Sequence, residues 1–340
     1  MSSEFKEYIK LIGKGQNAGK TLDQAQAEDA MLQVFNDQVT AEQLGAFLML
    51  LRVREETPEE LAGFIKAARA CISDEYKDLP VDLDLGCYAG KRRHLPWLLL
   101  AVKAYADSGK KVFIHGTAEP ESKRLYMREV FAHFGIQPAT NRVQAQGQLD
   151  KHGVCYAELS SVHPALDKLI QLRSVFALRS CANTLARMLN PSRARLSLHG
   201  VHHRHFDERH AEVAKICDEN NVMCFRGEGG EIEVNPERAV KLHFYAAGVR
   251  KSVQLPAFLD NWQIKPRALE LDELKALWCK QIDNAYGEAA VQATLTVFLI
   301  MEQLETLAKA KTEQQEEKII QQCREQASQL WQNRNSQYWF

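Results

Sequence analysis

The chain has 340 residues, 45% of them hydrophobic, and because a single core stops growing near ~250–300 residues this length favours two domains. The 43 lysines and arginines nearly balance the 44 aspartates and glutamates, for a formal net charge of −1. This balance excludes nucleic-acid binding driven by overall charge and leaves only a local basic surface as an option.

The first 75 residues predict a small helical domain. Apolar residues recur at helical spacing within residues 5–12, 25–35, 44–51 and 61–68. Thr21, Thr40 and Thr57 are suitable caps for the last three of these helices, and Pro58 suits a first helical turn. We expect this domain (1–75) to serve packing and dimerisation rather than catalysis.

From residue 76 the pattern alternates between strands and helices, which predicts a mostly parallel sheet covered on both faces. The fold class is therefore α/β, with a small helical domain beside a larger α/β domain (76–340) that ends in a helical tail (272–340). The predicted strands are 81–85, 111–114, 154–158, 195–200, 222–226 and 232–235. The predicted helices between them are 95–107, 122–134, 165–172, 181–188 and 207–219.

Cysteine usage and the lack of long apolar runs predict a cytoplasmic protein with no membrane contact. The eight cysteines are scattered and form no C-x-x-C pair, as is typical of reduced intracellular thiols rather than of disulfides or a zinc site. The first residues lack the apolar core of a signal peptide. The longest apolar run, near 95–102, is far too short for a membrane span.

The loops after the first two predicted strands favour an anion site. The first contains Gly86 and Gly90, and glycine lets the backbone come close to a ligand. The second begins at His115 and Gly116. A helix follows each loop, the N–H groups of a first helical turn attract anions, and open α/β sheets bind ligands at this edge. The anion is either a small phosphorylated substrate or a nucleic-acid backbone.

Basic residues accompany both loops. Lys91, Arg92 and Arg93 follow the first. Ser122, Lys123 and Arg124 follow the second, and Arg193 and Arg204 lie further along the chain. A run of like charges often only keeps a surface solvated. At an edge that already favours phosphate, the same run favours anion binding.

Residues 199–210 are dense in histidine: His199, His202, His203, His205 and His210. Imidazole suits zinc, but no H-x-x-x-H pair lies on a clear helix with a nearby acid. We expect a solvated loop, and the alternative is a pH-sensitive part of a basic groove.

Several motifs resemble the anthranilate phosphoribosyltransferase family (glycosyltransferase family 3), which shares its fold with pyrimidine nucleoside phosphorylases. Residues 42–68 follow the family pattern A-F-L-m-x-L-R-x-K-G-E-T-x-E-E-L-x-G almost position by position. His163-Pro164-Ala165, residues 173–183 and Asn190-Pro191 match later segments. The resemblance covers most of the chain, weakens beyond residue 240, and implies the family's fold and a homodimer.

The resemblance fails at the ligand loops. The enzymes carry G-T-G-G-D and N-I-S-T, which hold the pyrophosphate of phosphoribosyl pyrophosphate. Here Tyr88 replaces a glycine, the Asp is gone, and Pro96 removes a helix N–H donor. The enzymes' K-H-G-N-R becomes I-H-G-T-A at 114–118, without the Lys and the Arg. This loss, with basic residues gained, is similar to a branch of the family whose homodimeric members bind nucleic acid without sequence preference.

That resemblance implies a protein that binds DNA or RNA through backbone phosphates and needs no cofactor. Its expected contacts are Gly86, Tyr88, Gly90, Lys91, Arg92, Arg93, His115, Gly116, Ser122, Lys123, Arg124, Arg193 and Arg204.

The alternative is an active phosphoribosyl (glycosyl) transferase of the tryptophan-biosynthesis type. In this alternative Arg173, Arg179 and Asn183 bind the acceptor. Glu231 and Glu233 hold Mg²⁺, although they do not reproduce the family's D-E pair. The sequence assigns no catalytic residue, and the choice between enzyme and binding protein stays open.

Overall fold

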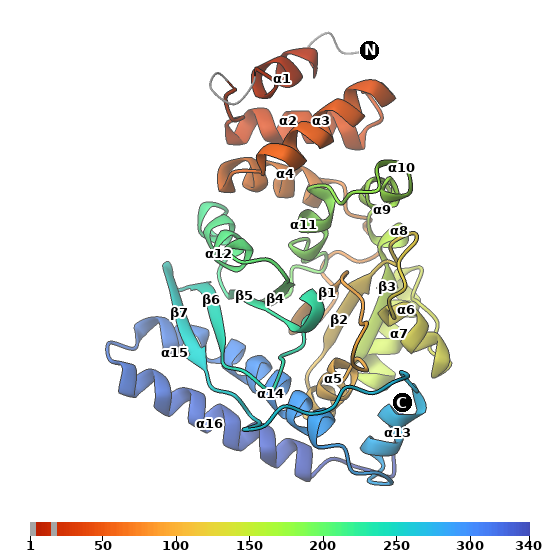
Figure 1. Ribbon diagram of the computed structural model, residues 1–340, viewed down its shortest axis with the longest axis vertical. Coiled ribbons are helices and arrows are strands. Elements are labelled where there is room, and N and C mark those ends of the chain that lie inside the picture. Colours follow the sequence, from red (N-terminus) through yellow and green to blue (C-terminus); the bar gives the residue numbers. More distant parts are fainter. Residues whose placement is uncertain (1–4, 15–18) are drawn as a thin grey trace.

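The computed structural model describes residues 5–14 and 19–340. Its N-terminal helical domain lies at the top of Figure 1. The other residues of the predicted 1–75 domain, 1–4 and 15–18, lie outside the described residues. The domain contains α1 (Phe5–Ile12), α2 (Gln24–Phe35), α3 (Ala41–Arg54) and α4 (Pro58–Ala70). Thr40 and Thr57 cap α3 and α4 as predicted. The expected cap at Thr21 is wrong, because the carboxylate of Asp23 accepts from Gln26 N at 2.8 Å instead.

The α/β domain is built on a seven-stranded sheet with the order β3-β2-β1-β4-β5-β6-β7. The parallel strands are β1 (Leu83–Cys87), β2 (Val112–Gly116), β3 (Val154–Glu158), β4 (Leu196–Val201) and β5 (Val222–Arg226). The antiparallel strands β6 (Val240–Ala246) and β7 (Val249–Leu255) complete it. The expected mostly parallel sheet is therefore present, and the predicted α/β fold class is confirmed.

The sequence misplaced the last strand. Residues 232–235 form no strand, and the chain there runs towards the loop after β1. The true edge is a hairpin whose two-residue turn, Ala247 and Gly248, has positive φ at both positions (50° and 74°). Such turns match the twist of paired antiparallel strands.

Helices cover both faces of the sheet (Figure 1). One face packs on α5 (Leu98–Asp107), α6 (Met127–His133), α13 (Asp272–Trp278), α14 (Ala285–Glu302), α15 (Leu304–Lys309) and α16 (Glu313–Gln332). The other packs on α7 (Arg142–His152), α8 (Leu159–Val162), α9 (Pro164–Gln171), α11 (Ala182–Arg187) and α12 (Phe206–Ile216). A one-turn helix, α10 (Arg173–Phe176), follows α9.

The helical domain and the second sheet face share one continuous core. Phe113 of β2 belongs to the same buried cluster as Phe47 of α3 and Phe64 of α4. The ring of Tyr76, just after the helical domain, stacks on Phe113 with centroids 5.8 Å apart. Side chains alternate across a strand, so the neighbours Val112 and Ile114 face the opposite cluster. This shared core fixes the helical domain against the second face of the sheet.

None of the eight cysteines forms a disulfide. Within the described ranges, no helix combines the length and the apolar character needed to cross a membrane.

Candidate functional site

The two loops expected to bind an anion meet at the carboxyl edge of the sheet, where the strand order reverses between β1 and β4. Open α/β sheets place ligands at such a point. Gly90 has φ +67°, which glycine adopts without strain. Directly after it, Lys91 N donates to Leu125 O at 2.7 Å, and Leu125 N donates to Lys91 O at 2.8 Å. The loops after β1 and β2 are therefore joined to each other.

Lys91 is an internal ion-pair partner. Its ammonium lies 2.5 Å from Glu233, with side chains 3% and 0% exposed. The other oxygen of Glu233 accepts from Leu98 N, at the start of α5, at 2.8 Å. Burial raises the pKa of Glu233, and the charge of Lys91 opposes that rise. Lys91 was predicted to contact nucleic acid, but its charge is used by Glu233 in this structure. Glu233 is equally unavailable to Mg²⁺.

An internal carboxylate, Glu231, occupies the backbone donors of the first loop. Its Oε1 accepts from Ala89 N at 2.7 Å and also from Gly90 N. Gly227 permits this approach, because a Cβ there would lie 1.7 Å from Glu231 O. The loop does attract an anion, but that anion belongs to the chain.

The pair Glu231 and Glu233 does not fit the expected Mg²⁺ site. Both oxygens of Glu233 are used by Lys91 and Leu98 N, and Oε1 of Glu231 is used by Ala89 N and Gly90 N. In the part of the chain that the structure describes, no group of three or more His, Cys, Asp or Glu side chains is arranged to hold a metal ion.

Tyr88 and His115 fill the interior below the first loop. The Tyr88 hydroxyl lies 2.5 Å from Nδ1 of His115, whose Nε2 lies 3.2 Å from Asp84. Tyr88 is 1% and His115 0% exposed, and burial raises the pKa of Tyr88 well above its ordinary value. Gly86 and Gly116 are buried within β1 and β2. The predicted ligand contacts at these four residues are wrong, because the side chains form a buried network and the glycines lie inside the sheet.

The three acceptor residues of the enzyme alternative do come together, around a carboxylate that sequence reasoning missed. Glu119, 1% exposed, accepts from Arg179 Nε and Nη2 at 2.7 Å each, from Asn183 at 2.7 Å and from Arg173. Burial disfavours the charged Arg179, but hydrogen bonding to Glu119 raises its pKa overall. We call Glu119, Arg173, Arg179 and Asn183 the Glu119 cluster. Its arginines are saturated by an internal acid.

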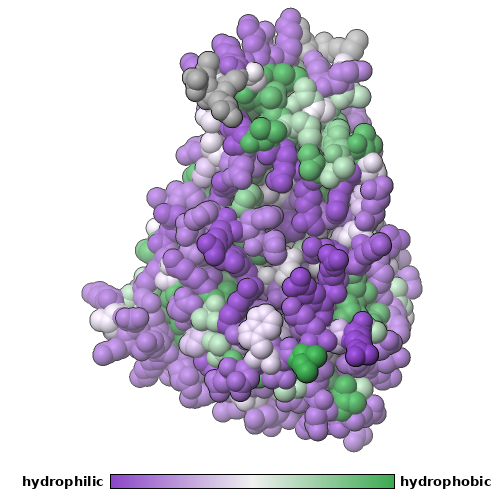
Figure 2. Space-filling view, in the orientation of Figure 1, coloured by the Kyte–Doolittle hydropathy of each residue, from purple (hydrophilic) through white to green (hydrophobic). Residues whose placement is uncertain are grey.

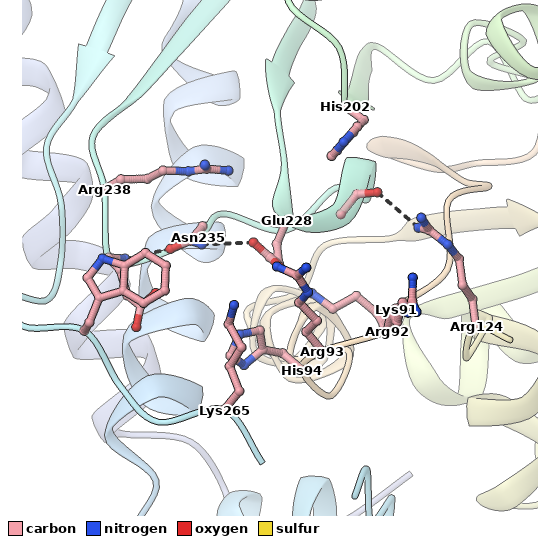
Figure 3. A pocket seen from close by; sticks show the side chains of 13 residues that line it. Lys91, Arg92, Arg93, His94, Arg124, His202, Glu228, Asn235, Arg238 and Lys265 are labelled. Atoms are coloured by element: carbon pink, nitrogen blue, oxygen red, sulfur yellow. Dashed lines mark hydrogen bonds between the residues drawn. The ribbon is translucent and has the colours of Figure 1, made fainter. Parts of the chain in front are cut away.

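A basic pocket of about 350 Å³ remains open at this edge (Figure 3). Besides Lys91, which is paired with Glu233, five cations line it together with two acids: Arg92, Arg93, Arg124, Arg238 and Lys265, with Glu228 and Glu237. Figure 3 shows these cations reaching the pocket from both of its sides. Among the described residues, no acidic side chain forms a salt bridge with Arg92, Arg93, Arg238 or Lys265. The pocket therefore presents uncompensated positive charge to solvent.

Of the other predicted basic contacts, most lie near this pocket. Arg124 donates to Ala89 O at 3.0 Å and to Gly229 O at 3.4 Å, so it braces the rim (Figure 3). Lys123 is exposed. Arg204 lines an adjoining pocket that also contains Arg238.

Two predicted residues do not join the basic pocket. The Ser122 hydroxyl accepts from the Tyr126 hydroxyl at 2.9 Å, which occupies it internally. Arg193 precedes β4 and therefore lies at the opposite edge of the sheet, 3.6 Å from Asp78. Arg193 is therefore away from the basic pocket, because residues before and after a strand lie at opposite ends of it.

The histidines near the pocket are mostly neutral. The His94 ring stacks on Tyr286 with centroids 3.9 Å apart, and burial lowers the pKa of His94 to about 4. Burial also lowers the pKa of His202. His199 and His210 are buried against each other, 3.1 Å apart, so the expected solvated loop is wrong for these two. The positive charge at the pocket comes from arginine and lysine.

Sequence reasoning also missed Arg238, Trp262 and Lys265, which line the basic pocket. They follow β5 and β7, where the resemblance to the family is weak. A Trp three residues before a Lys in a polar segment is a signal that could have been noticed. Glu119 had a comparable signal, since it directly follows the altered segment at 114–118.

Comparison with known proteins finds relatives of the same fold. Residues 6–71 match the helical bundle domain of a glycosyl transferase family. The chain is 26% identical over 235 residues to the anthranilate phosphoribosyltransferase of Dictyoglomus turgidum, which spans 67% of this chain and 66% of that protein. The Thermus thermophilus anthranilate phosphoribosyltransferase superposes with a TM-score of 0.72 over 97% of this chain and 98% of that one, at 18% identity.

The chain is similar to anthranilate phosphoribosyltransferases over most of its length and shares their fold. Not every relative is a named enzyme. The uncharacterized protein YbiB of Escherichia coli is 27% identical over 246 residues, or 71% of this chain and 76% of that protein. The Saccharomyces cerevisiae family member in complex with PRPP and Mg has a TM-score of 0.70 at 16% identity, covering 98% of this chain and 97% of that one. At such identity the likeness establishes the fold alone.

Proposed function

We propose that this family member binds nucleic acid without sequence preference at the basic pocket and does not transfer phosphoribosyl groups. The observation that supports the proposal is that, at the carboxyl edge of the sheet, acidic side chains fill the inner positions while basic side chains line the outer rim. The inner anion positions hold internal carboxylates, Glu231 and Glu119. The outer rim carries arginines and a lysine without acidic partners among the described residues.

The filled inner positions argue against a small phosphorylated substrate. A pyrophosphate at the first loop would have to displace Glu231 from the N–H groups of Ala89 and Gly90. A carboxylate-bearing acceptor at the Glu119 cluster would have to displace Glu119 from Arg173 and Arg179. Displacing a buried acid leaves it without its partners, and unpaired buried charges are strongly unfavourable.

The open rim suits a long polyanion. Guanidinium groups bind phosphate oxygens in a bidentate manner, and each neutralised phosphate releases counterions from the nucleic acid. Arg204, on the adjoining pocket, and exposed Lys123 extend the basic surface beyond the pocket itself. Contacts to phosphates position a nucleic acid but carry no sequence information, so binding is expected to be independent of sequence.

A salt series on labelled oligonucleotides, read by fluorescence anisotropy, tests the proposal. The slope of log affinity against log salt changes by ~0.7–0.9 for each phosphate contact. The Arg92→Ala/Arg93→Ala variant should therefore bind more weakly and with a slope shallower by ~1.4–1.8. Lys91 is left intact, because its removal would unpair Glu233.

The matched control removes two exposed cations far from the pocket, as Lys168→Ala/Arg193→Ala; their side chains are 70% and 73% exposed. This variant should bind as the parent does. Equal binding by the parent and the Arg92→Ala/Arg93→Ala variant at every salt concentration would refute the proposal.

Calorimetry with phosphoribosyl pyrophosphate and Mg²⁺ tests the enzyme alternative on the same sample. The proposal expects no heat of binding from the small ligand and tight binding of the oligonucleotide. Micromolar binding of phosphoribosyl pyrophosphate would overturn the non-enzymatic part of the proposal.

We further propose that the protein acts in the cytoplasm as a homodimer formed through the helical domain. Exposed apolar side chains support this, namely Val53 on α3 (84% exposed) and Val175 on α10 (73%). The two helices are neighbours, since a Cβ at Gly45 of α3 would lie 3.9 Å from the ring of Phe176. Figure 2 shows apolar surface gathered over the helical domain and a mostly hydrophilic surface below. Light scattering should give twice the chain mass, and a monomer mass would refute the dimer.

A further inference from the structure

We infer that Trp262 is a stacking platform for an unpaired base, so that the ligand of the basic pocket is single-stranded nucleic acid. This inference rests on the proposed nucleic-acid binding and assigns its substrate class. It is carried by one exposed aromatic side chain that stands on a hydrogen-bonded backbone segment and lines a pocket with several cations.

The segment that holds Trp262 is tied down on both sides of the indole. Before it, Phe258 N and Leu259 N donate to Pro236 O at 2.8 and 3.0 Å. After it, Gln263 N donates to the carboxylate of Glu237 at 2.6 Å. The backbone around Trp262 is thus held against the 236–237 turn, while Trp262 itself is 74% exposed. Because the backbone on both sides of Trp262 is already held, less of the chain has to be ordered when a ligand binds to the ring.

The indole lies among groups that bind phosphate. Trp262 lines the basic pocket with Arg93, Arg238 and Lys265. The Lys265 ammonium is 5.3 Å from the centroid of the Trp262 ring, within range of a cation–π interaction. Single exposed aromatic residues are common and need no explanation. An aromatic ring combined with unpaired cations in one pocket is the arrangement that binds single strands, with bases on the ring and phosphates on the cations.

The preference for single strands follows from the groups that a duplex and a single strand expose. Bases within a duplex are stacked on each other, so a duplex presents phosphates to the rim but no free base face to Trp262. A single strand presents both. A base–aromatic stack contributes about 5- to 150-fold in affinity, so single strands should bind more tightly than duplexes of equal length. Every base has a π-face, so this contact keeps binding independent of sequence.

Three oligonucleotides and three variants test the inference by anisotropy. The ligands are an oligothymidylate, a duplex of the same length, and an abasic strand that keeps the phosphates and lacks the bases. The variants are Trp262→Ala, Trp262→Phe and Ile264→Ala. Ile264 is a matched control, because it is 99% exposed on the same segment.

Trp262→Ala should weaken oligothymidylate binding by about 5- to 150-fold, the range for loss of one stack, and leave the salt slope unchanged. Its binding of the duplex and the abasic strand should equal that of the parent. Trp262→Phe should recover part of the loss, and Ile264→Ala should behave as the parent does.

A Trp262→Ala variant that binds oligothymidylate as tightly as the parent would overturn the inference while leaving the proposed function intact. An equal loss on all three ligands would also overturn it, because that result indicates a general disturbance of the pocket. Failure of the parent to bind any of the three would instead refute the proposed function.

Discussion

Removal of the Glu119 carboxylate should destabilise the protein and open a carboxylate site at the same time. Glu119 accepts hydrogen bonds from four side chains, those of Tyr126, Arg173, Arg179 and Asn183. The two arginine side chains are 30% and 31% exposed. Removing one partner of a buried ion pair destabilises by ~3–5 kcal/mol. Because water can reach both guanidinium groups in part, we expect a value at the lower end, about 3 kcal/mol, for Glu119→Ala.

The assay is urea unfolding, without and with sodium benzoate, at constant ionic strength. In Glu119→Ala a benzoate carboxylate can accept from Arg173, Arg179 and Asn183 in place of the lost side chain. A ligand at 100 times its Kd adds about 2.7 kcal/mol to the free energy of unfolding. The parent should gain nothing from benzoate, because Glu119 already fills the cluster.

The control is Glu121→Ala, which removes an exposed acid two residues away and should unfold as the parent does. If Glu119→Ala is too unstable to purify, Glu119→Gln keeps one acceptor oxygen and should show a smaller loss. The reasoning would be refuted if Glu119→Ala unfolded with the parent's free energy. It would also be refuted if benzoate stabilised the parent and the variant equally.

Two further predictions concern stability alone. Lys91→Met should lower the free energy of unfolding by ~3–5 kcal/mol, because it leaves buried Glu233 unpaired. The double variant Lys91→Met/Glu233→Gln should recover most of this loss. The control Arg92→Met should stay within ~0.5 kcal/mol of the parent. A Lys91→Met variant as stable as Arg92→Met in urea would contradict the ion pair. Burial lowers the pKa of His163 to about 4 from an ordinary 6.5. Between these two pH values the imidazole is protonated in the unfolded chain but not in the folded chain. The free energy of unfolding should therefore fall as the pH drops from 6.5 towards 4. His163→Asn keeps the helix cap that accepts from Leu166 N and should show a shallower fall in urea midpoints across this range; identical pH profiles would argue against the shift.

The sequence predicted the framework because local patterns determine it. Strands β3 and β5 were placed with their observed ends, and β1, β2 and β4 to within two residues. Continuous apolar runs between helical periods signal buried parallel strands. The caps at Thr40 and Thr57 followed from residue types beside the helices they begin. The β6–β7 hairpin was missed, although its Ala247-Gly248 turn lies between runs rich in β-formers.

The sequence also determined that this edge of the sheet would concentrate charge, since the basic residues and altered loops are local features. Which charges remain available was decided only by the tertiary structure. Lys91 and Arg92 are neighbours in a run of three cations, yet one is buried against Glu233 and the other faces solvent. Glu231 and Glu119 meet donors that lie more than 50 residues away in the chain. Because an ion pair depends on distance in space rather than along the chain, the sequence could name the charged groups but could not show which are already neutralised.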